Sequence, residues 1–300
     1  MGLNKFIFDI RTIPRTAYHD STSVKERLWK WSGSDQKVRF EDNLKDPVLG
    51  IYLKPYIDNP IEYRLNRQML RCSIEIEQFK NKPVDLFLGC SHMFGTGHHE
   101  ENTIPFLVSK HTNNLALNLA LGGGGIEISY IRLLKFVRTL NVKNVFHYQP
   151  AYPRYAYYRD NRMLTWLVGQ DEKEMRKLYG EEYVYDNYMQ TGREQYEYMK
   201  FLKLIMFETN LLNIPYYHIS SAEGNQNKDS YAGAQRDNSS VAEEFIKTDI
   251  AARDLVHKSV NQLKEIADIF VKDFKQYPNG KVNEAFPIEV ELTDNKSKLI

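Results

Sequence analysis

VDLFLG, residues 84–89, is a short and mainly apolar run that ends at a glycine. Such runs are typical of strands in parallel sheets, where helices bury both faces. Downstream, helical and strand patterns alternate: helix at 101–111, strand at 113–121, helix at 126–140 and strand at 142–149. This alternation predicts right-handed crossovers and an open α/β sheet, with strand 84–89 as its first strand.

The rest of the chain is organised around this sheet. Residues 1–80 mix aromatic, proline and charged residues without sustained periodicity, which indicates an irregular N-terminal extension with short strands packed on the main domain. The main domain is expected to span 81–278, with a helical insertion at about 155–212. Residues 279–300 form a short polar tail.

Two further elements complete the predicted domain. A fourth strand is expected at 214–220, before a loop rich in glycine, asparagine and serine at about 222–240. The stretch 257–277 predicts a long amphipathic helix, because its apolar residues fall on one stripe.

Composition excludes several classes of protein. The 300 residues are 42% hydrophobic and 26% charged, and no apolar run approaches the ~20 residues of a membrane span. Forty basic and 39 acidic residues give a net charge of +1, without the basic patch of a nucleic-acid-binding protein. Cys72 and Cys90, the only cysteines, cannot form a disulfide framework or a four-cysteine zinc site. With no secretory signal in the first residues, a cytoplasmic location is expected.

Three unusual loops follow the first three predicted strands. They are GCSHMFGTG at 89–97, GGGG at 122–125 and HYQPAYPR at 147–154. In an open parallel sheet, loops at the carboxyl ends of strands meet beside helix N-termini, and ligands bind there. We therefore expect the three loops to line one crevice.

Ser91 is the candidate nucleophile in this crevice. A serine on a tight turn between strand and helix presents its hydroxyl to the cleft, and the helix N-terminus supplies donors for a developing oxyanion. Asp254 and His257 lie three residues apart, close enough to meet on one helical turn or on a turn that leads into a helix. The carboxylate would hold the imidazole in the tautomer that accepts the serine proton.

These blocks resemble those of the SGNH (GDSL-type) hydrolases. LGCSHMFGTG is similar to their first block, NLALGGGG to their glycine-bearing second block and DLVH to their Asp-x-x-His block. The resemblance covers about residues 60–275 and is closest to uncharacterised SGNH-like proteins of bacteriophages and bacteria. It implies a three-layer α/β/α sandwich with a flavodoxin-like, mainly parallel sheet, and ester hydrolysis through a serine acyl-enzyme.

The resemblance also implies a role for each matched residue. Ser91 would be the nucleophile and would give the first oxyanion donor through its backbone N–H, with His257 as base and Asp254 as the residue that orients it. Gly123 best matches the second-block glycine, and Gly122 or Gly124 are alternatives within the run.

The third block departs from the family pattern. The family has Gly-x-Asn-Asp there, and its asparagine donates to the oxyanion, whereas this chain has HYQP and places Gln149 at that point. The glutamine amide could act as donor on a longer stem. His92, Gly124 and Arg154 are further candidates for contact with substrate.

Other readings of the same residues have less support. Four histidines, at positions 92, 98, 99 and 111, lack the His-Glu-x-x-His spacing that presents two metal ligands on one helix face, so no metal and no cofactor is expected. The GGGG run lacks the Lys-Ser/Thr of a phosphate-binding loop. Tyrosine clusters suit sugar stacking as well as ordinary packing. Two functions stay open: an esterase or deacylase acting on a small-molecule or glycan ester, and a catalytically silent module that binds in the same cleft.

Overall fold

The computed structural model describes residues 27–149, 154–159, 162–167, 176–177, 180, 193–219 and 247–282. Its centre is a five-stranded, wholly parallel sheet with the order β4-β3-β5-β8-β9. The strands are β3 (Val84–Gly89), β4 (Leu115–Asn118), β5 (Val142–Tyr148), β8 (Tyr216–Ile219) and β9 (Gly280–Val282). Numbered within the sheet, this is the 2-1-3-4-5 order of flavodoxin-like proteins. The predicted parallel α/β sheet is therefore confirmed, but its edge strand β9 comes from residues that the sequence analysis assigns to the polar tail.

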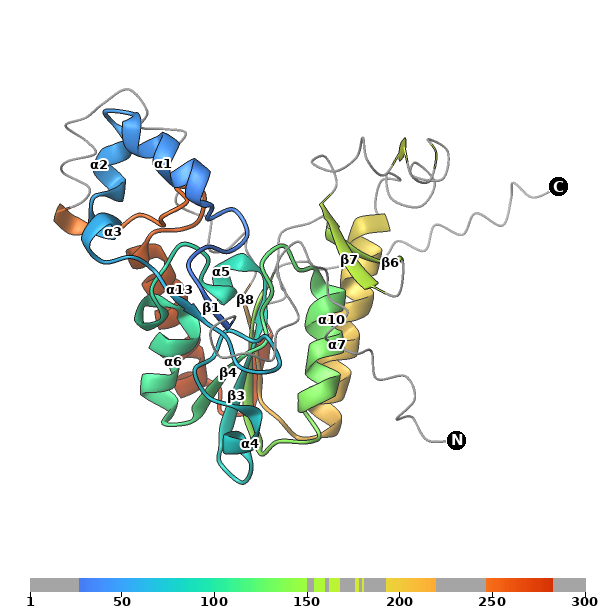
Figure 1. Ribbon diagram of the computed structural model, residues 1–300. Coiled ribbons are helices and arrows are strands. Elements are labelled where there is room, and N and C mark those ends of the chain that lie inside the picture. Colours follow the sequence, from blue (N-terminus) through green and yellow to red (C-terminus); the bar gives the residue numbers. More distant parts are fainter. Residues whose placement is uncertain are drawn as a thin grey trace, which may run out of the picture.

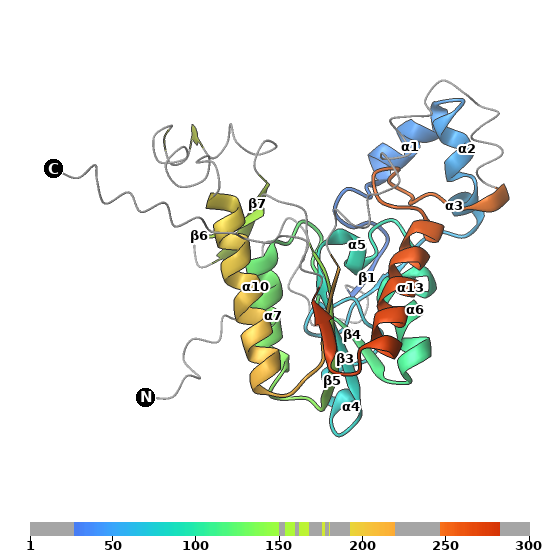
Figure 2. The ribbon, with the colours of Figure 1, turned by 180° about the vertical axis from the view of Figure 1, so that it is seen from behind.

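Helices flank both faces of the sheet (Figures 1 and 2). Helices α6 (Ile104–Thr112) and α13 (Val260–Gln276) lie on one face, and α7 (Ile126–Phe136) and α10 (Arg193–Leu211) lie on the other. Helix α13 packs on the sheet through an edge-to-face contact, in which the ring centroids of Phe146 (β5) and Phe270 (α13) lie 5.5 Å apart. The arrangement is compatible with a three-layer sandwich.

Several predicted boundaries shift for physical reasons. Strand β4 is shorter than the predicted 113–121, although Leu119 and Leu121 still donate backbone hydrogen bonds to carbonyls of β3 and its end. Helix α13 begins at Val260, not at His257, because Ser259 caps it through a reciprocal capping box with Gln262. The Asp-x-x-His segment thus lies in the turn that leads into the helix.

Residues 154–167 differ from the expected helical insertion. Two antiparallel strands, β6 (Arg154–Arg159) and β7 (Arg162–Leu167), lie in the predicted range, and α10 is the one long helix among its described residues. The helical pattern at 171–179 lies outside the described residues except for 176–177, which are helical. The loop at 222–240 lies outside them entirely.

The N-terminal region is more helical than its sequence suggests. A two-residue strand pair, β1 (Leu28–Trp29) with β2 (Tyr63–Arg64), frames it. Short helices lie within and after this pair: α1 (Lys37–Lys45), α2 (Leu49–Leu53), α3 (Pro55–Asp58) and α4 (Ile76–Phe79). Helices α1 to α3 lie beyond the carboxyl edge of the sheet, above α6 and α13 (Figures 1 and 2).

One hydrophobic cluster joins this N-terminal region to the sheet. It contains Tyr52 and Leu53 of α2 together with Phe87 of β3 and Phe270 of α13. The described part of the N-terminal region therefore shares a core with the sheet. None of the helices in the described part of the chain is long and apolar enough to cross a membrane.

Candidate active site

The candidate site lies where the strand order reverses. β3 sits between β4 and β5, so the loops after β3 and β5 leave the sheet on either side of a topological switch point, the usual ligand crevice of such sheets. Gly89 ends β3 with φ +148°, and a Cβ there would lie 2.6 Å from the carbonyl oxygen of Tyr148. Only glycine lets the two strand ends come this close.

Ser91 is the first residue of the short helix α5 (Ser91–Phe94). Its backbone N–H has no intrahelical partner at this position, which leaves it available as a donor. The side chain is largely buried, with 7% of the residue exposed. Gly95 ends the helix in the left-handed region at φ +84°, which turns the chain sharply back.

Arg71 holds the end of the loop that contains Ser91 (residues 89–97, the serine loop). Its guanidinium donates to the carbonyls of Phe94 (3.0 Å), Gly95 and His98 (2.6 Å). The Tyr63 ring covers the guanidinium at 4.6 Å. These bonds satisfy carbonyls that the short helix leaves unpaired, so the loop has one well-defined shape.

Asp254 and His257 form a hydrogen-bonded pair. His257 Nδ1 lies 2.6 Å from Asp254 Oδ2, and the two side chains are 10% and 0% exposed. Burial works against ionisation of Asp254, but hydrogen bonds from His257 and Ser34 and the charge of His257 lower the pKa of the carboxyl well below its ordinary value. The carboxylate therefore holds the Nδ1 hydrogen and leaves Nε2 as the acceptor.

The serine loop and the aspartate–histidine turn contact each other directly. The Arg253 N–H donates to the Gly97 carbonyl at 2.9 Å, and His98 Nε2 lies 2.7 Å from the Lys258 carbonyl. The rings of His92 and His257 meet edge to face at 5.0 Å. The structure thus brings the residue after Ser91 against His257. Ser91 and His257, both described, share no hydrogen bond with each other.

Gln149 is a further candidate donor at the carboxyl edge of the sheet. Gln149 follows β5, is buried, and its Oε1 has no hydrogen-bond partner among the described residues. The two ends of a glutamine amide are assigned from their partners, so this buried amide can present its NH₂ to a ligand. A buried polar atom without a partner is costly, and with the NH₂ in the place of Oε1 a bound oxygen would relieve that cost.

Backbone hydrogen bonding narrows the choice of donor within the glycine run to Gly122 or Gly123. The Gly124 N–H donates to the Leu121 carbonyl at 2.9 Å, so it is not free for an oxyanion, and this removes one of the alternatives to Gly123. Gly123 is exposed, has φ +76°, and its N–H has no partner among the described residues. The side chain of Arg154 lies outside the described residues, so its predicted contact with substrate stays a prediction.

Sequence reasoning missed the residues that hold the aspartate turn. Ser34 Oγ donates to Asp254 Oδ2 at 2.5 Å, and Asp35 forms a buried ion pair with Arg253 at 2.6 Å. Both come from the N-terminal region, to which the sequence assigned no chemistry. More than 200 residues separate the partners, and no local pattern marks such a contact.

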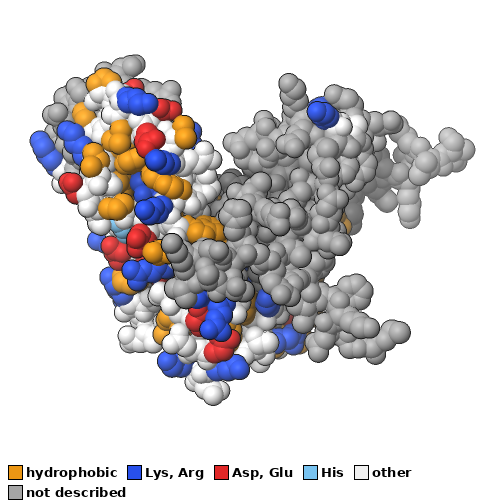
Figure 3. Space-filling view, viewed as in Figure 1, with side chains coloured by type: hydrophobic (Ala, Val, Ile, Leu, Met, Phe, Trp, Pro, Cys, Tyr) orange, Lys and Arg blue, Asp and Glu red, His pale blue; other side chains and the backbone are white. Residues whose placement is uncertain are grey.

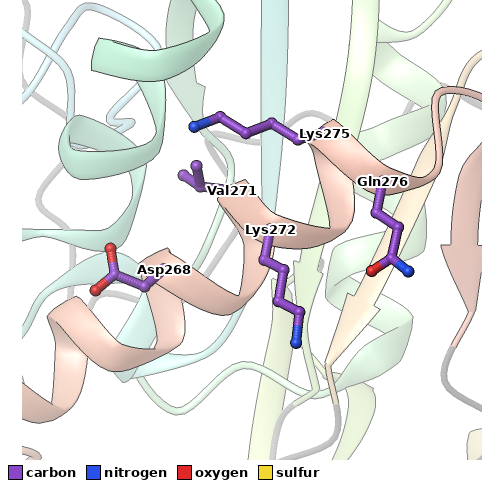
Figure 4. A pocket seen from close by; sticks show the side chains of 5 residues that line it. All are labelled: Asp268, Val271, Lys272, Lys275 and Gln276. Atoms are coloured by element: carbon purple, nitrogen blue, oxygen red, sulfur yellow. The ribbon is translucent and has the colours of Figure 1, made fainter.

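The described residues contain no group of three or more metal-ligating side chains. A depression of about 490 Å³ lies on the outer side of α13 and contains none of the candidate residues (Figure 4). It is lined by Asp268, Val271, Lys272, Lys275 and Gln276. Basic and acidic side chains intermingle on the described part of the face in Figure 3.

His98 makes stability depend on pH. It is buried beneath the aspartate–histidine turn, and burial lowers its pKa from 6.5 to about 4. Below pH 6.5 this histidine is protonated in the unfolded chain but stays neutral in the folded chain. The free energy of unfolding therefore decreases as the pH falls from 6.5 toward 4, by about 1.4 kcal/mol per pH unit. Urea unfolding at several pH values should show this slope, reduced by this amount in His98→Gln. The same slope in His98→Gln as in wild type would show that His98 does not cause this pH dependence.

A scan of the chain against protein-family models gives no match, and a search among curated protein sequences gives none either. The assignment of a function therefore depends on the geometry described above and on the motif resemblance.

Proposed function

We propose that the protein is a serine hydrolase of the SGNH type that cleaves an ester bond, with a small molecule or an acylated carbohydrate as substrate. The observation that carries the proposal is the buried Asp254–His257 pair at 2.6 Å, whose imidazole lies against the loop that begins with Ser91. Its place at the switch point of a 2-1-3-4-5 sheet supports the same conclusion.

The proposed chemistry follows the order of a serine acyl transfer. Ser91 Oγ attacks the ester carbonyl while His257 Nε2 takes its proton, and the same proton then passes to the leaving alcohol. A water molecule, deprotonated by His257, cleaves the acyl-enzyme and releases the acid. Asp254 stays ionised throughout, because its hydrogen bonds and the histidine beside it hold its pKa low.

The oxyanion would be held by backbone and side-chain donors from three strand ends. The N–H groups of Ser91 and Gly123 have no partner among the described residues, and Gln149 is buried just after β5, at the same edge of the sheet. Donors fixed before the reaction need no reorganisation as charge develops, which makes them effective in catalysis.

Ester hydrolysis by purified protein tests the proposal. The wild-type chain should hydrolyse p-nitrophenyl acetate above the rate in buffer, and Ser91→Ala should return to that rate. Ser109→Ala is a matched control, since Ser109 donates only to the Phe106 carbonyl on α6. Wild-type and Ser91→Ala proteins with equal rates would overturn the proposal and favour a silent binding module.

Gln149→Ala is predicted to lower kcat tenfold to a thousandfold with little change in KM. Loss of one oxyanion donor costs about 3 kcal/mol, and the donor acts mainly on the transition state. Gln149→Asn, which keeps an amide, should retain more activity than Gln149→Glu, which offers no N–H. Steady-state kinetics on one ester measure this, and an unaffected kcat in the alanine variant would show that Gln149 is not a donor.

A further inference from the structure

The Asp254 carboxylate is held from both sides. Oδ1 accepts the backbone N–H groups of Val256 (3.1 Å) and His257 (3.2 Å). Oδ2 accepts the Ser34 hydroxyl at 2.5 Å as well as His257 Nδ1 at 2.6 Å. Ser34 is therefore the only side chain besides His257 that donates to this carboxylate among the described residues.

The backbone places the Ser34 hydroxyl rigidly. Ser32 and Asp35 exchange backbone hydrogen bonds at 3.0 and 3.1 Å around a tight turn, in which Gly33 takes φ +63°. Asp35, the next residue, is clamped by the guanidinium of Arg253 at 2.6 to 3.1 Å and by the Tyr63 hydroxyl at 2.6 Å. Ser34 thus contacts Asp254, and its neighbour Asp35 contacts Arg253.

We infer that Ser34 is a positioning residue, which holds Asp254 in the orientation that directs His257 Nε2 toward the serine loop. Without this donor, the carboxylate keeps only its backbone partners and the imidazole, and it can rotate about its own side-chain bonds. A carboxylate with fewer donors also attracts the Nδ1 hydrogen more strongly, which favours the protonated imidazole. The catalytic part of this inference rests on the proposed function, whereas the hold on the Asp254–His257 pair does not.

The expected effect has a specific signature. Ser34→Ala should raise the pH at which His257 titrates and shift the acid limb of the kcat/KM profile in the same direction. At its plateau, kcat/KM should fall roughly tenfold to a hundredfold, the range for one hydrogen bond to a charged group, with KM little changed. A merely structural role would not move the titration of one imidazole.

The experiment combines NMR with kinetics on the full chain. The His257 ring resonance, assigned by its absence in His257→Gln, is titrated in wild type, Ser34→Ala, Ser34→Thr and Ser32→Ala. Threonine keeps the hydroxyl and should restore wild-type behaviour. Ser32 is the matched control, because it lies in the same turn and its side chain makes no hydrogen bond to Asp254. Ser34→Cys, a weaker donor, gives the same comparison if the alanine variant does not fold.

Each outcome of these measurements either supports or overturns the role inferred for Ser34. A His257 titration shifted in Ser34→Ala but not in Ser32→Ala supports the inference, and a shifted acid limb extends it to catalysis. Equal titrations in Ser34→Ala and wild type, or an equal shift in Ser32→Ala, would overturn it. A shifted titration in a protein that hydrolyses no ester would support the hold on the pair and overturn the hydrolase proposal instead.

Discussion

His257→Ala should reduce kcat/KM on a model acetyl ester by about 10⁴- to 10⁶-fold while the protein stays folded, since nucleophile, base and orienting residue act as one unit. The imidazole side chain is 10% exposed, and its loss leaves the buried Asp254 carboxylate with the Ser34 hydroxyl and two backbone N–H groups as donors. The variant should therefore unfold at a lower temperature than wild type but still in one cooperative transition. The measurement is steady-state kinetics alongside circular dichroism of the same preparation.

His111→Ala is the control for this prediction. His111 lies in the exposed last turn of α6, outside the candidate site, so its loss should leave kcat/KM at the wild-type value. Activity within a few-fold of wild type in His257→Ala would show that the triad assignment is wrong, whatever the control does.

Asp35→Ala should lower the free energy of unfolding by about 3 to 5 kcal/mol, because it leaves the Arg253 guanidinium buried and without its carboxylate. The two side chains are 1% and 2% exposed, and Arg253 also lies over the Trp31 ring at 4.1 Å. Urea unfolding measures the loss. Activity should fall too, since residue 253 adjoins the proposed orienting aspartate.

An exposed pair gives the matched comparison. Asp42 bonds Lys45 at 2.8 Å on α1, with side chains 63% and 75% exposed, and Asp42→Ala should lower the free energy of unfolding far less than Asp35→Ala, because water screens an exposed pair. Similar losses in the two variants would contradict the view that burial makes the Asp35–Arg253 pair important.

Much of the sheet was predictable because its signals are local. Short segments rich in apolar and aromatic residues mark β3, β4, β5 and β8, and the amphipathic stripe marks α13. Chain order and the handedness of crossovers then place the loops after β3 and β5 side by side. The spacing of Asp254 and His257 likewise encodes their contact within one turn.

The N-terminal helices lack such signals. Helix α1 buries none of its residues fully and packs against the core through Phe40 and Leu44, a short apolar pair that gives a weak pattern, and α2 and α3 are too short to display a 3.6-residue period. Their packing is fixed by tertiary contacts. The same holds for Ser34, whose hydroxyl meets a carboxylate 220 positions away.

Covalent labelling of Ser91 tests the central claim most directly. A fluorophosphonate should add one phosphonyl group to the wild-type chain, and mass spectrometry of its peptides should place that group on Ser91. The adduct should disappear in Ser91→Ala and form far more slowly in His257→Ala, since the base activates the hydroxyl. No adduct between about pH 6 and 9, or an adduct on another residue that persists in Ser91→Ala, would contradict the account.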